Sequence, residues 1–201
     1  MAKIVISGVL YLFLLMGCLD MGTDVERMHN AVKRGDVARV KALLKDGVSA
    51  NIKNEKDTSP MELAVVYGCF ECLEELIKNG GDVNETDKRG EESLIFLSLS
   101  QHRFPYLKLL VKNGAEVNTQ DSMGYTPLIS AIVLSQYDMA EFLLNSGADP
   151  TLANNTGKTP LDYLREDKIT PEFEQYEYRK KVRKIILLRL SAPSKRPKGN
   201  G

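Results

Sequence analysis

Tryptophan is absent from this chain of 201 residues, and aromatic residues make up only 7% of it. This scarcity argues against a large aromatic cage for a ligand. The two histidines, His29 and His102, lie far in the chain from the Cys69 and Cys72 pair, which argues against a four-ligand zinc site. The sequence also has no glycine-rich phosphate loop and no Gly-x-Ser-x-Gly elbow. We therefore expect no metal, no cofactor and no enzymatic activity.

The formal net charge is zero, but the charges are unevenly distributed. Residues 179–201 contain nine basic and no acidic side chains, which leaves 18 basic against 27 acidic side chains in residues 1–178. An acidic body repels nucleic acid over most of its surface. We expect no nucleic-acid partner, and only the basic C-terminal segment suits an anionic surface.

Residues 172–190 alternate charged and apolar side chains, and this pattern has two interpretations. The first is an elongated capping helix whose apolar stripe covers the part of the fold that comes before it in the chain. The second is contact with anionic lipid through Lys180, Lys181, Arg183 and Lys184. Residues 191–201 are rich in proline, lysine and glycine, which predicts a disordered basic tail.

The N-terminal residues have the pattern of an export signal. Lys3 is followed by an apolar run from Ile4 to Gly17, broken only by Ser7 and Gly8. As a helix this run would rise about 21 Å, less than the ~30 Å hydrocarbon core of a bilayer. A basic start, a short apolar stretch and small residues at its end predict a signal peptide over residues 1–17.

The end of this segment, Leu15-Met16-Gly17-Cys18, resembles the lipobox of bacterial lipoproteins, although Met16 replaces the usual alanine or serine. The resemblance implies that Cys18 carries lipid and opens the mature chain, followed by a short linker over residues 18–21. It implies an exported, membrane-anchored lipoprotein that faces the periplasm or the cell exterior. The alternatives are an ordinary cleaved signal that leaves a soluble periplasmic or secreted protein, an uncleaved anchor, or a buried N-terminal helix.

A period of about 33 residues organises the rest of the chain. Apolar stretches end at four glycines with spacings of 33, 34 and 33: Gly47, Gly80, Gly114 and Gly147. Such a glycine is the expected left-handed end of a helix. A hydroxyl residue followed by proline, which suits a helix start, lies half a period away at residues 59–60, 126–127 and 159–160. The period predicts helix pairs that bury one another's apolar faces by stacking.

The segments from Asp121 to Ala131 and from Met139 to Asp149 carry the turn, the Thr-Pro-Leu helix start and the Gly-Ala-Asp ending of one such unit, which resembles an ankyrin repeat. The resemblance implies an all-α solenoid of stacked helix-turn-helix units joined by β-hairpin-like loops. We expect about five units, caps included, in a domain over residues 22–190: 22–51, 52–84, 85–118, 119–151 and 152–190. The third unit should be the least regular, because Glu92-Ser93 replaces Thr-Pro and one residue is added between its helices. Asp57 replaces the turn glycine of the second unit, which makes that turn costlier unless it adopts another type.

The ankyrin resemblance also implies a monomeric, non-catalytic protein–protein interaction module, here a membrane-tethered envelope adaptor for a protein partner. Ankyrin proteins use their hairpin tips and the inner face of their first helices for recognition. The matching positions that we select on the tips are Lys56, Lys88, Arg89, Met123, Tyr125 and Lys158. On the first helices we select Tyr67 and Phe96. A protective role, such as shielding an enzyme or neutralising a toxin, would use the same surface.

Cys69 and Cys72 fall in the first turn of a predicted helix, where the helix dipole lowers the pKa of a thiol. Side chains three residues apart on a helix have Cβ atoms ~5–6 Å apart, whereas a disulfide requires ~3.5–4.5 Å. Three interpretations remain open: inert thiols, a structural disulfide, and a thiol-disulfide or redox function. His29 occupies the position where the family's histidine supports the turn by hydrogen bonding.

Overall fold

The computed structural model describes residues 22–86, 93–100, 102–166 and 175–191, which form ten helices. Within those ranges there is no β-strand, and the single extended pairing is an antiparallel bridge between Thr86 and Ser93. The helices pair and stack as repeats, which confirms the predicted all-α class. The predicted signal peptide, Cys18, the linker over residues 18–21 and most of the basic tail lie outside the described residues.

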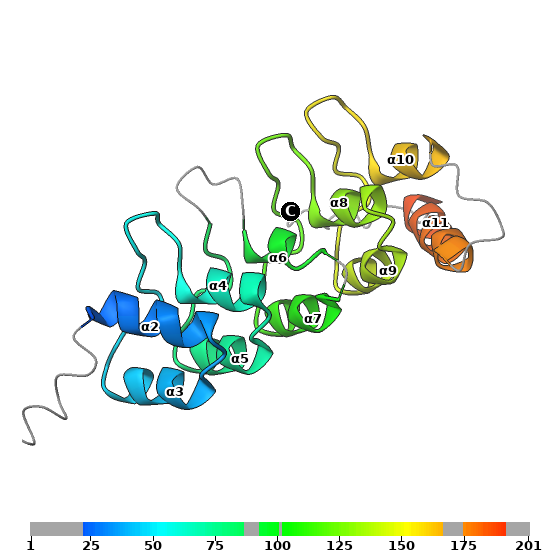
Figure 1. Ribbon diagram of the computed structural model, residues 1–201. Helices are drawn as coiled ribbons and strands as arrows, with labels where there is room; N and C mark the ends of the chain where they lie inside the picture. The colour runs from blue at the N-terminus through cyan, green and yellow to red at the C-terminus, as the bar shows by residue number, and fades with distance from the viewer. Residues whose placement is uncertain (1–21, 87–92, 101, 167–174, 192–201) are drawn as a thin grey trace, which may run out of the picture. The chain divides into compact units, whose positions relative to one another are not determined.

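The chain divides into two compact units, residues 1–80 and 81–201. In the first unit, α2 (Asp24–Lys33) pairs with α3 (Val37–Lys45), and α4 (Pro60–Tyr67) pairs with α5 (Phe70–Lys78), and the two pairs stack (Figure 1). The second unit contains α6 (Leu94–Leu97), α7 (Phe104–Lys112), α8 (Pro127–Val133), α9 (Tyr137–Asn145), α10 (Pro160–Glu166) and α11 (Gln175–Ser191). There α6 contacts α7, α8 pairs with α9, and α10 packs beside α8.

Three of the first helices, α4, α8 and α10, begin at a proline that follows a hydroxyl residue, as predicted. Ser59 Oγ accepts a hydrogen bond from the backbone N–H of Glu62 at 3.0 Å, and Thr126 Oγ1 accepts one from Ile129 at 3.2 Å. Each cap satisfies a backbone N–H that has no partner inside its own helix, and is worth about 1 kcal/mol. These local bonds fix where each repeat turns into its first helix.

The second helices end at the periodic glycines, all of which have positive φ: 88° at Gly47, 85° at Gly80, 92° at Gly114 and 100° at Gly147. Three of these glycines are also held by an asparagine side chain from the end of the preceding repeat. The periodic asparagines donate through Nδ2 to these glycine carbonyls in the pairs Asn51–Gly80 (2.9 Å), Asn84–Gly114 (3.1 Å) and Asn118–Gly147 (3.4 Å). Consecutive repeats inside each unit are therefore joined by hydrogen bonds as well as by apolar contact.

The third repeat has the shortest of the described helices. Helix α6 covers only four residues, and Ser93 before it makes no side-chain capping bond. Pro105 lies in the first turn of α7, where its missing N–H costs no helix hydrogen bond. His102, with φ 68°, lies just before α7 in the left-handed region.

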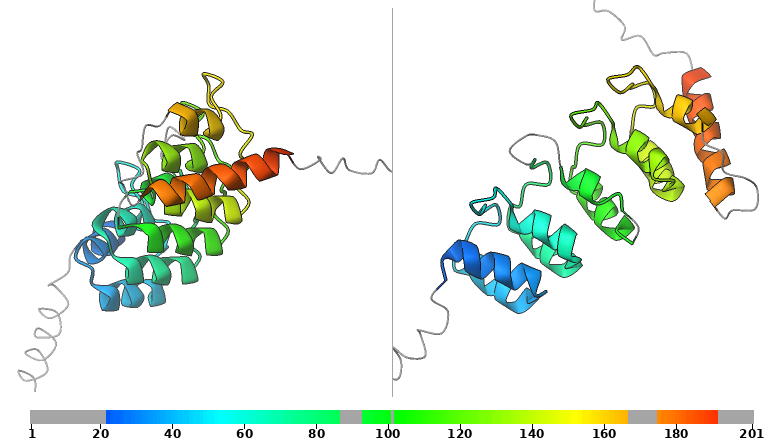
Figure 2. Two further views of the ribbon diagram at one scale, coloured as in Figure 1. Left: turned by 90° about the vertical axis from the view of Figure 1, so that its right-hand side faces the viewer. Right: turned by 45° about the horizontal axis from the view of Figure 1, so that its top comes forward.

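The last repeat ends in a long helix, α11, in place of a short second helix. It packs mainly on α9 and buries Val182 and Ile186 completely (Figure 2). Arg189 donates to the carbonyls of Leu144 and Ala148 at the end of α9, the latter at 3.1 Å. Helix α11 therefore covers the apolar side of the preceding repeat.

Candidate protein-interaction surface

Three turns that precede first helices are built in the same way, each around one side-chain oxygen. Asp121 Oδ1 accepts backbone N–H groups of Met123 at 2.9 Å and Tyr125 at 2.8 Å. The corresponding Oδ1 atoms of Asn54 and Asn154 accept the N–H groups two and four residues later, at 2.9–3.1 Å. In each turn the backbone N–H of the same residue also donates to the carbonyl four residues later at 3.0–3.1 Å, so one short polar residue closes the turn through both its side chain and its backbone.

The residue three places after each of these is in the left-handed region: Asp57 at φ 67°, Gly124 at 77° and Gly157 at 78°. Asp57 therefore does not change the type of its turn. Its carboxylate lies 3.2 Å from Lys53 Nζ, and the turn keeps the backbone bond from Asp57 N to Asn54 O at 2.9 Å. Of the two outcomes that the sequence left open, the turn keeps the same type, with a non-glycine residue in the left-handed region.

The turns at residues 119–125 and 152–158 in the second unit are hydrogen-bonded to each other. The backbone N–H of Asn155 donates to Met123 O at 3.0 Å, and its Nδ2 donates to Ser122 O at 2.9 Å. Gln120 Nε2 donates to Ala153 O at 3.1 Å. A Cβ on Gly124 would lie 2.5 Å from Asn155 Oδ1, so the close approach depends on this glycine. The two tips form one firmly held surface, which we call the paired-turn surface.

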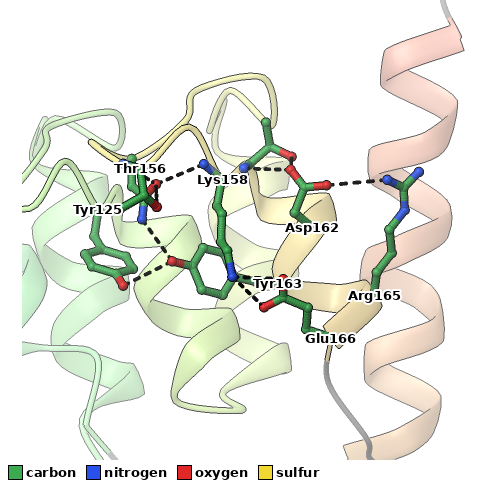
Figure 3. Close-up of polar contacts among 9 residues, drawn as sticks. Tyr125, Thr156, Lys158, Asp162, Tyr163, Arg165 and Glu166 are labelled. Carbon is green, nitrogen blue, oxygen red and sulfur yellow. Dashed lines mark hydrogen bonds and ion pairs between the residues drawn. The ribbon is translucent and has the colours of Figure 1, made fainter.

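Met123 and Tyr125 present side chains on the paired-turn surface. Met123 is 59% exposed although it is large and apolar. Tyr125 packs against Tyr163 of α10 with ring centroids 5.9 Å apart (Figure 3). Aromatic and methionine side chains are enriched where protein interfaces form.

The hydrogen-bond directions at this tyrosine pair follow from Asn154. Its Oδ1 accepts from neighbouring N–H groups, so its Nδ2 is the donor to Tyr163 Oη at 2.9 Å. Tyr163 in turn is 3.1 Å from Tyr125 Oη and donates to it. The Tyr125 hydroxyl hydrogen then has no acceptor among the residues that the structure describes. The relay leaves Tyr125 as a positioned donor at the edge of the surface.

These contacts also change the acid–base behaviour of the neighbouring groups. The hydrogen bond with Tyr125, followed by burial, raises the pKa of Tyr163 to about 12. Glu166 accepts from Lys158 Nζ with both carboxylate oxygens at 2.8 Å and raises the pKa of that lysine. Lys158 was selected from the sequence as a partner contact, but its ammonium is already engaged by Glu166.

In the first compact unit, residues 1–80, Lys56 lies at an exposed turn and Tyr67 lies at the end of α4. Tyr67 is 57% exposed, and Lys33 Nζ lies 6.0 Å from its ring centroid. A groove of about 580 Å³ is lined by residues of α2 and the turn, including Thr23, Lys33 and Lys56. This groove is a second, more polar candidate contact region within that unit.

The three remaining positions that we selected from the sequence are not seen at an exposed turn. Phe96 lies on the short α6 and is half-buried. Lys88 and Arg89 lie outside the described residues.

Comparison with known proteins gives the same assignment as the geometry. The family model for ankyrin repeats (3 copies) matches residues 8–87 and 72–154. The chain belongs to the ankyrin repeat family. Ankyrin repeats imply a protein–protein interaction module, and proteins of this family are typically non-catalytic.

Several curated proteins resemble this ankyrin chain. The putative ankyrin repeat protein YahD of Escherichia coli is 27% identical, with 68% of this chain and 87% of that protein covered. The ankyrin repeat-containing protein P1E11.10 of Schizosaccharomyces pombe is 26% identical over 79% of this chain and 59% of its own length. The E3 ubiquitin-protein ligase KEG of Arabidopsis thaliana is 33% identical over 33% of this chain, which spans only 4% of that ligase.

Cys69 and Cys72 are joined by a disulfide at the start of α5, with Cα atoms 5.2 Å apart. Cys69 also caps the helix, because its Sγ accepts from the backbone N–H of Cys72 at 3.3 Å. Cys69 is 8% exposed and Cys72 is fully buried. Burial leaves little access for a substrate disulfide, so no observation favours the redox alternative.

His29, in the first repeat, supports the turn that opens the second repeat and anchors itself to its own helix α2. Its Nε2 lies 2.9 Å from Thr58 O and its Nδ1 lies 2.7 Å from Val25 O. Among the described residues no cluster of His, Cys, Asp or Glu has the arrangement of a metal site. None of the helices within the described ranges has the length and hydrophobicity required to cross a bilayer.

Tyr163 and Asn154 take part in the paired-turn surface but were not selected from the sequence. Asn154 lies 33 residues after Asp121, so the period marks it as the residue that builds the turn. Tyr163 lies 33 residues after Ser130 of α8, which places it in the first helix of the next repeat. The 33-residue period therefore indicated where both residues lie in their repeat. The contact of Tyr163 with Tyr125 depends in addition on how closely the two repeats approach.

Proposed function

We propose that this ankyrin-repeat protein is a non-catalytic adaptor, tethered to a membrane through lipid on Cys18, that binds a protein partner on the paired-turn surface. The observation that carries the proposal is the firmly held pair of turns, which exposes Met123 beside the hydroxyl donor of Tyr125. A preorganised surface loses little conformational freedom on binding, so its contacts translate into affinity.

The position of Tyr125 implies a feature of the partner. Because its hydroxyl hydrogen is directed by the relay from Asn154 and Tyr163, the partner should present a hydrogen-bond acceptor there, such as a backbone carbonyl or a carboxylate. Met123 supplies apolar area next to this donor. Because the ammonium of Lys158 is already bound by Glu166, we do not expect this lysine to form an ion pair with the partner. Its role in the surface is to lie over the ring of Tyr163.

The test is photo-crosslinking in native membranes with benzoylphenylalanine in place of Met123. Lys112, an exposed residue of α7, is the matched control position. We expect one dominant adduct from Met123 and none from Lys112. The same set of adducts from both positions, or no adduct from Met123, would overturn the proposed surface.

Affinity for the captured partner then tests the donor. Tyr125→Phe keeps the ring and removes only the hydroxyl, so it should weaken binding by about 1 kcal/mol, roughly fivefold in Kd. Tyr176→Phe makes the same change on α11, outside the paired-turn surface, and as the control it should leave Kd unchanged. An unchanged Kd for Tyr125→Phe means that the partner offers no acceptor at this point.

The tether has its own test. In a bacterial host, globomycin should cause an unprocessed precursor to accumulate, and Cys18→Ser should abolish labelling by palmitate and release the protein from the membrane fraction. A lipid anchor with two or more acyl chains holds a protein stably, whereas a single chain binds only marginally. Processing that ignores globomycin supports the ordinary cleaved signal instead.

A further inference from the structure

The outer face of α11 combines exposed apolar side chains with basic ones. Val182 and Ile186 face α9 and are fully buried, whereas Leu187 is 44% and Leu188 is 60% exposed. Tyr178 is 41% and Leu190 is 43% exposed. A terminal repeat normally has a polar outer face, because that face has no further repeat to cover it. Exposed leucines at this end therefore call for another surface to cover them.

The charge on α11 is strongly positive, since residues 175–191 contain six basic side chains and one acidic side chain, Glu177. Four of the basic side chains have partners. Lys181 lies 2.6 Å from Glu141 on α9 and Lys180 lies 3.1 Å from Glu177, while Arg179 and Arg189 donate to backbone carbonyls. The other two, Arg183 and Lys184, are exposed, and no partner is found for them among the described residues.

The unpaired charges lie on the same side of the helix as the leucines. Lys184 is three and four residues before Leu187 and Leu188, and Arg183 is four residues before Leu187, so these side chains are neighbours on one face. Together with Tyr178 and Lys180 they line one shallow surface hollow. In the second unit α11 lies at the C-terminal end, with none of the unit's described helices beyond it (Figure 1). The sequence then continues with Lys195, Arg196 and Lys198 and no acidic residue.

We propose that this outer face of α11 docks on a bilayer that contains anionic phospholipid. Leu187 and Leu188 enter the boundary between headgroups and acyl chains, and Arg183 and Lys184 contact the lipid phosphates. A helix that presents leucines flanked by lysine and arginine is suited to lie in that interface, and anionic lipid supplies the complementary charge. A second copy of the chain is disfavoured as the occupant, because a symmetric contact would place Arg183 and Lys184 against the same charges. The proposal does not depend on the partner surface or on Cys18.

The absence of tryptophan makes a site-specific test possible, because Leu188→Trp in the full chain introduces a single indole. Its fluorescence is recorded with phosphatidylcholine vesicles and with vesicles that also contain phosphatidylglycerol. The control is Leu134→Trp, which replaces a leucine of similar exposure (53%) at the end of α8. Fluorescence from α11 reports on this helix even if the N-terminal segment also binds lipid.

We expect a blue shift and quenching by brominated lipid for Leu188→Trp only when phosphatidylglycerol is present, and neither for Leu134→Trp. Arg183→Glu combined with Lys184→Glu in the reporter chain should weaken the partition coefficient by at least about tenfold. Lys45→Glu with Lys112→Glu makes the same change in net charge at exposed sites elsewhere and should have little effect. Thermal melts verify that each variant is folded.

Three results would overturn the proposal. One is an indole spectrum that is the same with and without anionic lipid. Another is an equal shift in the Leu134→Trp chain. The third is a blue shift that needs no lipid and grows with protein concentration, which would assign the face to self-association.

Discussion

The two turn glycines Gly124 and Gly157 allow the contact between neighbouring turns to be measured by itself. Their φ angles are nearly equal, 77° and 78°. A Cβ on Gly157 would meet nothing within 4 Å, whereas a Cβ on Gly124 would lie 2.5 Å from Asn155 Oδ1 and 2.7 Å from its backbone nitrogen. Alanine at either position is strained by about 1–2 kcal/mol in the left-handed region. Only at Gly124 is crowding added, which costs about 1–3 kcal/mol more.

We therefore expect Gly157→Ala to lower the free energy of unfolding by about 1–2 kcal/mol and Gly124→Ala to lower it by about 2–5 kcal/mol. Urea unfolding followed by circular dichroism measures both values. Amide hydrogen exchange adds a local readout, because the N–H of Asn155, bonded to Met123 O at 3.0 Å, should lose protection only in Gly124→Ala. Equal midpoints for the two variants, with Asn155 still protected in both, would show that the turns do not depend on close approach.

Three further perturbations follow from the structure. Asn118→Ala removes hydrogen bonds to Asp149 N at 2.8 Å and to Gly147 O at 3.4 Å and should lower the free energy of unfolding by about 1–2 kcal/mol in urea; an unchanged midpoint would contradict the inter-repeat link. Tyr125→Phe should return the pKa of Tyr163 from about 12 toward 10.0, read from tyrosinate absorbance on alkaline titration. Because that pKa is raised, the contribution of neutral Tyr163 to stability is complete below pH 10 and is lost as the pH rises through about 12; a pKa that stays near 12 without the Tyr125 hydroxyl would refute the assigned cause. Asp57→Gly relieves a left-handed residue and should raise the melting temperature slightly, by the equivalent of about 0.5 kcal/mol, whereas a lower melting temperature would mean that the Lys53 ion pair outweighs the strain.

The amino-acid sequence by itself determined the helices and the repeat. Hydroxyl–proline pairs such as Thr126-Pro127 and glycines such as Gly114 act on the backbone next to them, so their effect is local and visible in the sequence. The 33-residue period then predicted helix pairs that stack, and it placed Met123 and Tyr125 at a turn. For the same reason it indicated that the third repeat would be irregular.

Only the tertiary structure decided which side chains are free to meet a partner. Lys158 forms an ion pair with Glu166, and Tyr125 accepts a hydrogen bond from Tyr163 that orients its hydroxyl group. Asn155 joins the two turns by hydrogen bonds. These contacts join residues of different repeats, or of a turn and the helix that follows it, and they depend on packing distances that the sequence period does not contain. The periodic pattern specifies what each repeat is, and the approach of one repeat to the next within its unit specifies what its surface can bind.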